Sequence, residues 1–336
     1  TIDCVTCAAA LKLPLPLWLA AMVHMPARTM DTVVDARVQT EVVNASNTPR
    51  QVIVRISLLD PGGREVATQD APAQTIEPAG RATLTQDLKL DSPKRWDLEA
   101  PYLYRAVARI VTEGAVVDEA ATTFGIRDAR FEPATGFWLN GKNFKVLGVN
   151  LHHDGGAVGA AVPLSVWERR LKNLKQLGVN AIRTAHNPPS PDFLDLTDRL
   201  GFLVMDEVWD AWTVGKPHAN YGVHLIFREW WEADTRDTVL RDRNHPSIVL
   251  YSTGNEIHDT PFPDVAKPIL KGLIDVFHKH DPSRPVTQGL FRPNISKDYH
   301  NGLADMLDVV GQNYRENELI AAYHQKPTRK VIGTEN

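Results

Sequence analysis

The sequence predicts an α/β protein in which a TIM-type (β/α)8 barrel follows an immunoglobulin-like β-sandwich. Strand-like segments recur about every 8 to 12 residues up to roughly residue 127, with no helical segment between them, as in sandwiches of this type. Strand-like and helix-like segments then alternate, which is typical of a parallel sheet. About seven such strand units, without a glycine-rich phosphate loop after the first, favour the barrel over a dinucleotide-binding fold.

We expect residues 1–27 to be a remnant of an upstream region. Their segment LKLPLPLWLAAMVHMPA loosely resembles the core of a signal peptide, but two prolines interrupt it and the chain begins with Thr. Cys4 and Cys7 are spaced C-x-x-C, yet neither further metal ligands nor a strand-turn-helix context accompanies them. We interpret them as an incidental pair, and since no cysteine follows, we expect no disulfide framework.

The predicted sandwich, residues 28–127, consists of segments with the mixed apolar and polar alternation of half-buried strands. These segments are TVVDARVQTEVVN (32–44), RQVIVRISLLD (50–60), IEPAGRATLTQDLKL (76–90) and the hairpin-like YLYRAVARIVTEGAVVDEAATTFG (102–125). A Pro-Gly-Gly turn follows the second segment.

The predicted barrel, residues 128–336, alternates strands with helices. Strands are expected at 144–153, 179–187, 202–209, 247–256, 285–290, 307–314 and 330–335, and helices at 163–178, 190–201, 229–240 and 269–280. Because a complete barrel has eight strands, we expect the eighth strand and its helix to be missing from this sequence.

Two of these helices carry start and stop signals. Ser165 and Glu168 have the spacing of a capping box, and Gly178 is placed to end that helix. In the next helix Ser190 is the expected N-cap and Gly201 the expected stop.

The composition is that of an ordinary globular protein, with 43% hydrophobic residues, 23% charged residues and a formal net charge of -4. The sequence has no basic stripe that would indicate a nucleic-acid partner. Its apolar amino-terminal stretch is too short to cross a membrane. The compartment stays open between the cytoplasm and a bacterial periplasmic or secreted location. Eight tryptophans suit a sugar-binding cleft as well as a core.

Polar side chains gather where the predicted barrel strands end. In chain order they are Asn150, His152, His153 and Asp154; Arg183, His186 and Asn187; Asp206, Glu207 and Trp209; Asn255 and Glu256; Asn313 and Tyr314; and Glu335. Each alone has a structural explanation, such as a helix cap or a satisfied core histidine. Together they deliver polar groups from six strands to one rim, where barrel enzymes have their active sites.

Glu256 and Glu335 end the fourth and seventh predicted strands, so their carboxylates are expected to face each other across the barrel mouth. Two carboxylates about 5 to 5.5 Å apart suit retaining glycoside hydrolysis, in which one is the acid and the other the nucleophile. Asn255, beside Glu256, is placed to hydrogen-bond the 2-hydroxyl of a sugar.

These residues lie in segments that resemble glycoside hydrolase family 2, the family of β-galactosidases, β-glucuronidases and β-mannosidases. The most specific segments are GVNLHHD, NAIRTAHNPP, FLVMDEVWD, DRNHPSIVLYSTGNE and VIGTEN, and WDLEAPYLY is similar to the stretch before the family's barrel. The sequence of these segments is most similar to bacterial β-galactosidases, so the resemblance implies a retaining exo-β-glycosidase that acts on terminal β-D-galactosides. It also implies that Glu256 is the acid/base, Glu335 the nucleophile and Tyr314 the residue that orients the nucleophile.

A carbohydrate is therefore the expected partner, and a homo-oligomer is left open. The resemblance implies that His152, Arg183, His186, Asp206 and Asn255 line the sugar pocket, and we add Asp154, Asn187 and Trp209 from their places at strand ends. No cofactor is expected to be required, although some galactosidases of the family use Mg²⁺ and Na⁺. His153 and Asp154 hint at a metal, but a sugar hydroxyl contact is the preferred interpretation.

Two alternatives remain at this stage. One is a β-glucuronidase or β-mannosidase of the same family, where a uronate needs a cationic partner in the pocket. The other is an inactive carbohydrate-binding fragment, which the missing eighth strand motivates.

Overall fold

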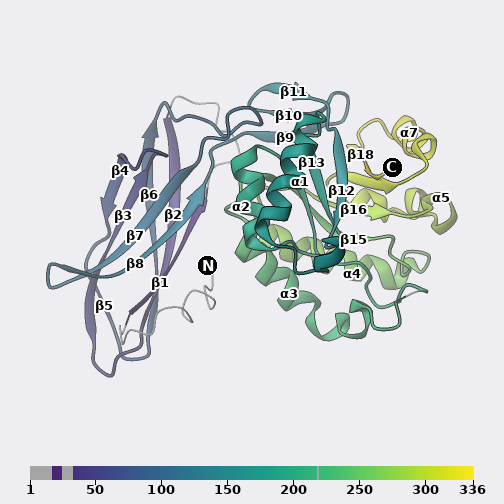
Figure 1. Cartoon of the computed structure of the whole chain (residues 1–336). Helices are drawn as coiled ribbons and strands as arrows, with labels where there is room; N and C mark the ends of the chain where they lie inside the picture. The colour runs from purple at the N-terminus through teal and green to yellow at the C-terminus, as the bar shows by residue number, and fades with distance from the viewer. Residues whose placement is uncertain (1–16, 25–32, 218) are drawn as a thin grey trace. The chain divides into compact units, whose positions relative to one another are not determined.

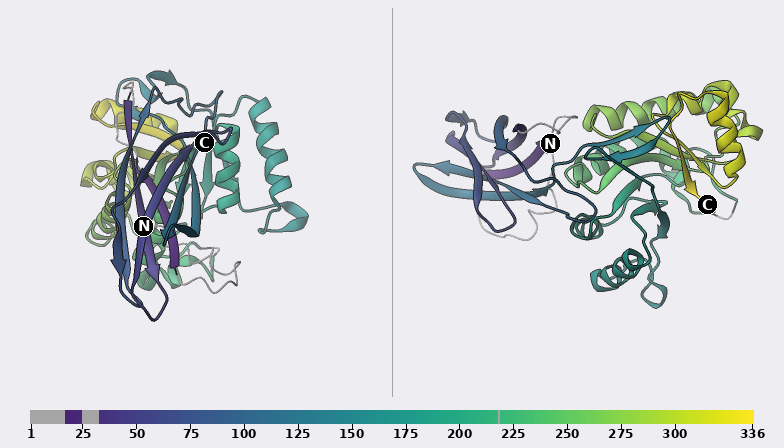
Figure 2. Two further views of the ribbon diagram at one scale, coloured as in Figure 1. Left: turned by 90° about the vertical axis from the view of Figure 1, so that its left-hand side faces the viewer. Right: turned by 90° about the horizontal axis from the view of Figure 1, so that it is seen from above.

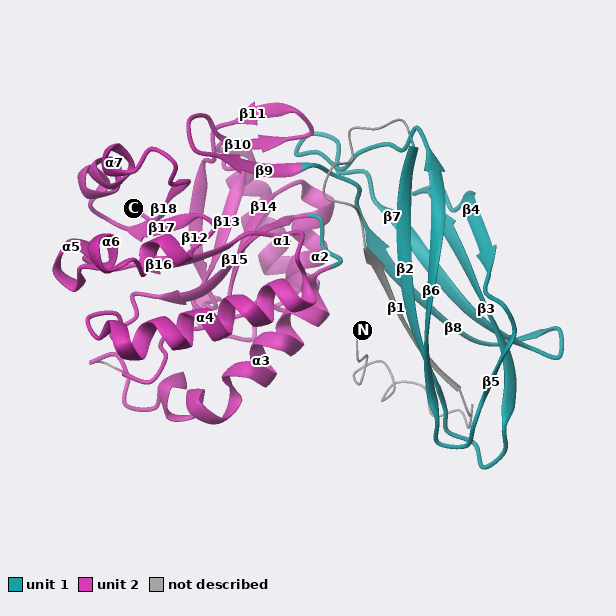
Figure 3. Cartoon of the chain, turned by 180° about the vertical axis from the view of Figure 1, so that it is seen from behind, with its two compact units in different colours: residues 1–128, 244–246 teal, residues 129–243, 247–336 magenta. Residues whose placement is uncertain are grey.

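The chain is described by a computed structural model, which covers residues 17–24, 33–217 and 219–336. It divides into two compact units, coloured separately in Figure 3. These are Thr1–Asp128 with Asn244–Pro246, and Ala129–Arg243 with Ser247–Asn336. Strands build the first unit, and alternating strands and helices build the second, as the sequence predicted (Figure 1). No helix among the described residues is long and apolar enough to cross a membrane.

The first unit consists of two antiparallel sheets. Its strands are β1 (Leu17–His24), β2 (Val33–Asn44), β3 (Arg50–Leu59), β4 (Glu65–Asp70), β5 (Gln74–Ile76), β6 (Arg81–Asp91), β7 (Tyr104–Thr112) and β8 (Ala115–Phe124). The sheet orders are β1-β2-β6 and β4-β3-β7-β8, with β5 paired to β3. Alternate residues of β2 and β6 are buried, and they share one apolar core with β3 and β7. The period-2 pattern of the sequence therefore predicted both the strands and their buried face.

The amino-terminal interpretations are only partly accessible to the structure. Cys4 and Cys7 lie outside the described residues. Of the predicted remnant, residues 1–27, the structure describes 17–24, which form strand β1 and pair antiparallel with β2 along their full length. This segment is therefore a strand of the first sheet.

The second unit begins with a small antiparallel sheet that the sequence did not predict. It contains β9 (Ala129–Glu132), β10 (Gly136–Leu139) and β11 (Lys142–Phe144) in the order β11-β10-β9. Its strands are only three or four residues long, which is too short for a period-2 pattern to stand out.

Seven parallel strands follow and form one curved sheet in chain order, from β12 to β18 (Figures 1 and 2). They are β12 (Gly148–His152), β13 (Ala181–Ala185), β14 (Leu203–Glu207), β15 (Ile248–Asn255), β16 (Val286–Leu290), β17 (Val310–Asn313) and β18 (Val331–Glu335). All seven strands that the sequence predicted for the barrel are confirmed.

Helices connect these strands and cover the sheet. They are α1 (Leu164–Gln176), α2 (Pro191–Leu200), α3 (Phe227–Asp242), α4 (Pro263–His280), α5 (Pro293–Ser296), α6 (Asp298–Asn301) and α7 (Glu316–Gln325), with 3-10 turns at Gly156–Val158, Val223–Leu225 and Ala304–Met306. The apolar faces of α1 to α4 and the strand residues that point toward them form one core.

The helix signals were right in three of four cases. Ser190 caps α2 by accepting the N–H of Phe193 at 3.3 Å, and Gly201 ends α2 in a left-handed conformation with φ of 71°. Gly178, with φ of 84°, follows the end of α1. The capping box at Ser165 was wrong, because α1 begins at Leu164 with no side-chain cap, so Ser165 already lies inside the helix.

Candidate active site

The sheet brings the two predicted glutamates to one edge. Parallel neighbouring strands end side by side, and Glu256 directly follows β15 while Glu335 ends β18. The β15–β16 ladder shifts its register just before Asn255, and the β17–β18 ladder shifts just before Asn313. Such irregularities re-aim side chains at strand ends. The backbone of Glu256 also adopts a left-handed φ of 47°, a strained conformation that is concentrated at functional sites.

Asn313 joins the two carboxylates. Its Nδ2 lies 3.3 Å from Oε1 of Glu256 and 3.4 Å from Oε2 of Glu335, and 2.9 Å from Oδ1 of Asn255. The two carboxylate oxygens are therefore separated by at most the two distances combined, about 6.7 Å. The other end of the Asn313 amide is held by the hydroxyl of Thr334, which donates to Oδ1 at 2.6 Å. The geometry thus places the glutamates around a single, fixed amide nitrogen.

Glu335 is held by cationic and hydroxyl donors. Arg183 Nη1 donates to its Oε2 at 2.8 Å, and the Tyr314 hydroxyl donates to its Oε1 at 2.6 Å. Partial burial alone raises the pKa of this carboxyl group, but the hydrogen bonds from Tyr314 and Arg183 outweigh it, so the pKa lies below its ordinary value. The hydrogen bond to Glu335, followed by burial, raises the pKa of Tyr314 to about 12, so the phenol remains a donor. Glu335 is therefore an ionised carboxylate with a fixed orientation.

Arg183 is itself fixed by a buried carboxylate that the sequence did not single out as a site residue. Glu207 is fully buried and accepts two parallel hydrogen bonds from the guanidinium, at 3.0 Å from Nε to Oε2 and 2.9 Å from Nη2 to Oε1. It also accepts from Ser252 Oγ at 2.7 Å and lies 2.7 Å from Nδ1 of His186. Planar, bidentate pairing of this kind orients an arginine as well as neutralising its partner. Glu207 consequently aims Arg183 at Glu335.

The absence of a side chain at Gly289 leaves room for this network. A Cβ atom added at Gly289 would lie 2.9 Å from Oδ1 of Asn313 and 3.1 Å from Nη2 of Arg183. The carbonyl of Gly289 also accepts the N–H of Glu256 at 2.8 Å. A glycine is therefore required at this position by the close approach of both side chains.

Asn255 lies inside the same network. It is 3% exposed, and its Oδ1 accepts from Arg183 Nη2 at 2.8 Å and from Asn313 at 2.9 Å. His186 also reaches the network, with Nε2 3.9 Å from Oε2 of Glu335. The exposed ring of His152 packs edge-on against His186, with centroids 5.0 Å apart.

Two predicted pocket residues, Asp206 and Trp209, belong to the other face of the sheet. Asp206 is fully buried two positions after the core residue Val204, so its side chain faces the helices, and its charge acts on Arg241 of α3. Trp209 is 3% exposed and donates its indole N–H to Thr235 Oγ1 at 2.9 Å. Alternation between faces accounts for Asp206, whose neighbour Glu207 points to the site, whereas Trp209 lies beyond the end of β14.

Asp154 and Asn187 are exposed and lie outside the network. The carboxylate of Asp154 accepts the N–H of Gly156 at 2.6 Å and so stabilises the 3-10 turn after β12. Asn187 follows the end of β13. Neighbouring His153 lines a cavity of about 290 Å³, together with Trp167 of α1 and Phe193 of α2.

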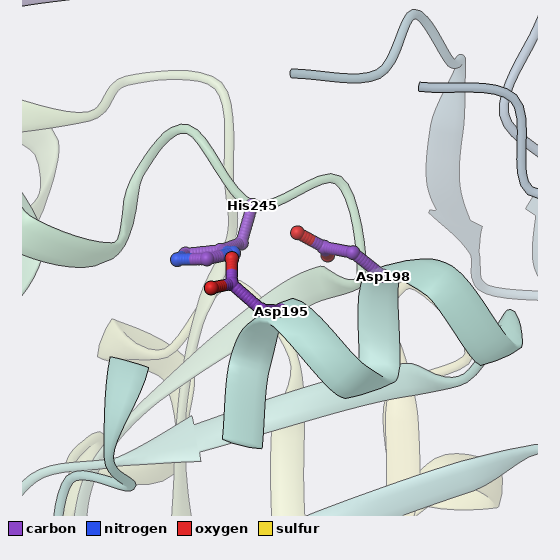
Figure 4. Close-up of side chains that lie close together, drawn as sticks. All are labelled: Asp195, Asp198 and His245. Carbon is purple, nitrogen blue, oxygen red and sulfur yellow. The ribbon is translucent and has the colours of Figure 1, made fainter. Parts of the chain in front are cut away.

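Figure 4 labels Asp195, Asp198 and His245, none of which follows the carboxyl end of a barrel strand. Asp198 accepts the backbone N–H of Ser247 at 3.0 Å, which ties α2 to the start of β15. We therefore assign Asp198 to the support of the sheet and not to the candidate active site.

The chain matches known families and proteins over most of its length. The barrel domain model described as "Glycosyl hydrolases family 2, TIM barrel domain" matches residues 133–335, and the model "Glycosyl hydrolases family 2" matches residues 23–127. The chain belongs to glycosyl hydrolase family 2. The resemblance drawn from the motifs is therefore confirmed, and family 2 is a family of glycoside hydrolases.

Individual family 2 proteins show the same relationship. The chain is 37% identical to "Beta-galactosidase BoGH2A" of Bacteroides ovatus over 88% of this chain and 38% of that protein. It is 36% identical to a "Putative beta-glucuronidase" of Formosa agariphila over 83% of this chain and 24% of that protein. The crystal structure of a family 2 member from Bacteroides cellulosilyticus superposes with a TM-score of 0.87 at 34% identity, covering 96% of this chain and 41% of that one. The chain thus spans less than half the length of these relatives.

Proposed function

We propose that the chain carries the catalytic centre of a retaining exo-β-glycosidase that removes terminal β-D-galactosides by double displacement. One observation carries this proposal: Glu256 and Glu335 both lie within 3.4 Å of the Asn313 amide nitrogen. Retaining enzymes hold their two carboxyl groups about 5 to 5.5 Å apart, whereas inverting enzymes need about 6.5 to 9.5 Å to admit a water molecule. The upper limit of about 6.7 Å between the nearest oxygens supports the retaining arrangement.

The partners of the two glutamates support their different roles. Glu335, ionised and oriented by Arg183 and Tyr314, attacks the anomeric carbon while Glu256 gives its proton to the departing glycosidic oxygen. Among the described residues Glu256 has no hydrogen-bonded arginine or lysine, which suits a group that must hold and release a proton. In the second step Glu256 takes a proton from water, the water oxygen attacks the anomeric carbon, and the ester bond to Glu335 breaks.

The choice of galactose rests on relatives and on charge. The relative from Bacteroides ovatus is named a β-galactosidase, whereas the relative from Formosa agariphila is named a putative β-glucuronidase. A uronate needs a free cation, but the guanidinium of Arg183 is already engaged by Glu207 and Glu335, and Lys216 is paired with Asp210. We therefore propose the galactoside and keep the glucuronide and mannoside as outcomes of the test.

We also propose the domain organisation predicted from the sequence, with a boundary near residue 128 and an immunoglobulin-like first domain. Two antiparallel sheets around one apolar core support the second part of this proposal.

A mechanism-based label tests the proposed function. The chain is incubated with activated 2-deoxy-2-fluoro-β-galactoside, -glucuronide and -mannoside, and the adduct is mapped by peptide mass spectrometry. We expect a covalent fluorogalactosyl ester on Glu335. A label on another residue would overturn the assignment of the nucleophile, and reaction with only the glucuronide or mannoside would replace the substrate.

Replacing Tyr314 with Phe should shift the pH profile. The Tyr314 hydroxyl lowers the pKa of Glu335, so its removal is expected to raise that pKa and move the acidic limb of kcat/KM to higher pH. The profile is measured on an aryl galactoside, with Tyr323→Phe on α7 as the control. An acidic limb at the same pH in both variants would contradict the role of Tyr314.

A further inference from the structure

The side-chain amide of Asn255 is held from both ends. Its Oδ1 accepts from Arg183 and Asn313, and its Nδ2 donates to Oδ1 of Asp210 at 3.2 Å. The backbone N–H of Asn255 also donates to the carbonyl of Trp209 at 3.1 Å, so its main chain and its side chain are bonded to two consecutive residues after β14. These contacts fix which end of the amide is the donor and leave its second N–H for a substrate.

Asp210 has its own partner. Nζ of Lys216 lies 3.1 Å from the same Oδ1 that accepts from Asn255, and the two side chains are 18% and 32% exposed. Lys216 reaches back over a loop that is anchored independently, because the buried carboxylate of Asp259 accepts the hydroxyl of Thr213 and, at 3.1 Å, the N–H of Val214. The ammonium group therefore has a defined position beside Asp210.

The packing of the loop also holds Lys216 in place. A Cβ atom added at Gly215 would lie 2.6 Å from the ring of His224, so the backbone just before Lys216 is pressed against that side chain. Charge gives a second reason for the pair. Through Asn255, Asp210 joins a fourth carboxylate to the network of Glu207, Glu256 and Glu335, and the Lys216 ammonium offsets its charge.

We propose that Asp210 and Lys216 form a positioning pair, which orients the Asn255 amide toward the substrate hydroxyl adjacent to the reacting carbon. This rests on the proposed function, in which Asn255 contacts the 2-hydroxyl of the sugar. Asp210 acts through Asn255 and does not touch the sugar. Lys216 keeps the Asp210 oxygen in the place where it accepts from the amide.

Removal of the 2-hydroxyl from the substrate tests the proposal. Asp210→Ala, Asp210→Asn and Lys216→Met are compared on an aryl β-galactoside and on its 2-deoxy counterpart. Asp210→Ala is expected to lower kcat/KM by about 10- to 100-fold on the parent substrate and by less than about threefold on the 2-deoxy substrate, because the lost contact exists only with the hydroxyl. Asp210→Asn keeps an acceptor oxygen, so its kcat/KM on the parent substrate should be close to that of the unchanged chain. The kcat/KM of Lys216→Met should lie between those of the two Asp210 variants.

The matched control removes an ion pair that lies on the helix surface. Lys271 and Asp275 are paired at exposed positions of α4, so Asp275→Asn should leave kcat/KM unchanged on both substrates. Equal losses on both substrates for Asp210→Ala would overturn the positioning role, since a general structural defect does not distinguish them.

A crystal structure of the Asp210→Ala variant separates this inference from the proposed function. If the unchanged chain hydrolyses no aryl glycoside, the proposed function fails, and the structure then decides the positioning role. An Asn255 amide that rotates away from Arg183 supports the role. An amide that keeps its orientation without Asp210 overturns it.

Discussion

Replacing Glu335 with Gln is expected to lower kcat by on the order of 10⁴-fold or more, because the amide cannot form the glycosyl ester. The shape of the side chain is preserved, and its oxygen can still accept from Tyr314. The loss therefore reports the missing nucleophile and not a collapsed site. The loss is measured as turnover of an aryl galactoside. The mass of the protein after treatment with the 2-fluoro sugar shows whether an adduct forms, and none should form.

Glu316→Gln is the matched control for this variant, since Glu316 is exposed at the start of α7. It should keep full turnover and form the adduct. If Glu335→Gln retained the rate of the unchanged chain, or still formed a glycosyl ester, the double-displacement assignment would be wrong.

Replacing Glu256 with Gln is expected to produce a loss that depends on the leaving group. A poorly activated alcohol needs the proton of the acid, so kcat/KM should fall by about 10²- to 10⁴-fold, whereas a dinitrophenolate departs unaided and should show a far smaller loss. The second step also loses its base. With the activated substrate the covalent intermediate should therefore accumulate and give a burst of released phenol.

Stopped-flow measurement of this burst, beside a series of aryl galactosides of graded leaving-group pKa, tests the prediction. The slope of log kcat/KM against leaving-group pKa should be steep in Glu256→Gln and shallow in the unchanged chain. The same slope in both would remove Glu256 from the role of acid.

Much of the architecture could be predicted because it follows from local patterns. Apolar alternation in β2 and β6 and the continuous apolar runs of the parallel strands reflect burial of one face or of both faces. The sheet at residues 129–144 was missed because its strands are too short to display a period. The segment 17–24 was not predicted as a strand, because its pairing with β2 is what makes it one.

The site was predicted less evenly. Glu256, Glu335 and Tyr314 stand at strand ends, and the structure brings all three together. Asn313 and Glu207 stand there too, but their bridging roles depend on atoms from other strands. A rule was available for Glu207: two residues beyond Met205 on β14, it shares a face with that residue and not with core residue Val204, so strict alternation would have favoured it over Asp206.

The sequence alone determined the order of strands and helices, the edge at which polar groups gather, and the two carboxylates that meet there. These follow from periodicity and from the single direction in which parallel strands point. Only the tertiary structure decided how the side chains of Asn255 and Asn313 point and which side chain links the carboxylates. The physical reason is that register shifts before Asn255 and Asn313 change where side chains point, and that hydrogen bonds such as Arg183 to Glu335 join residues distant in the chain.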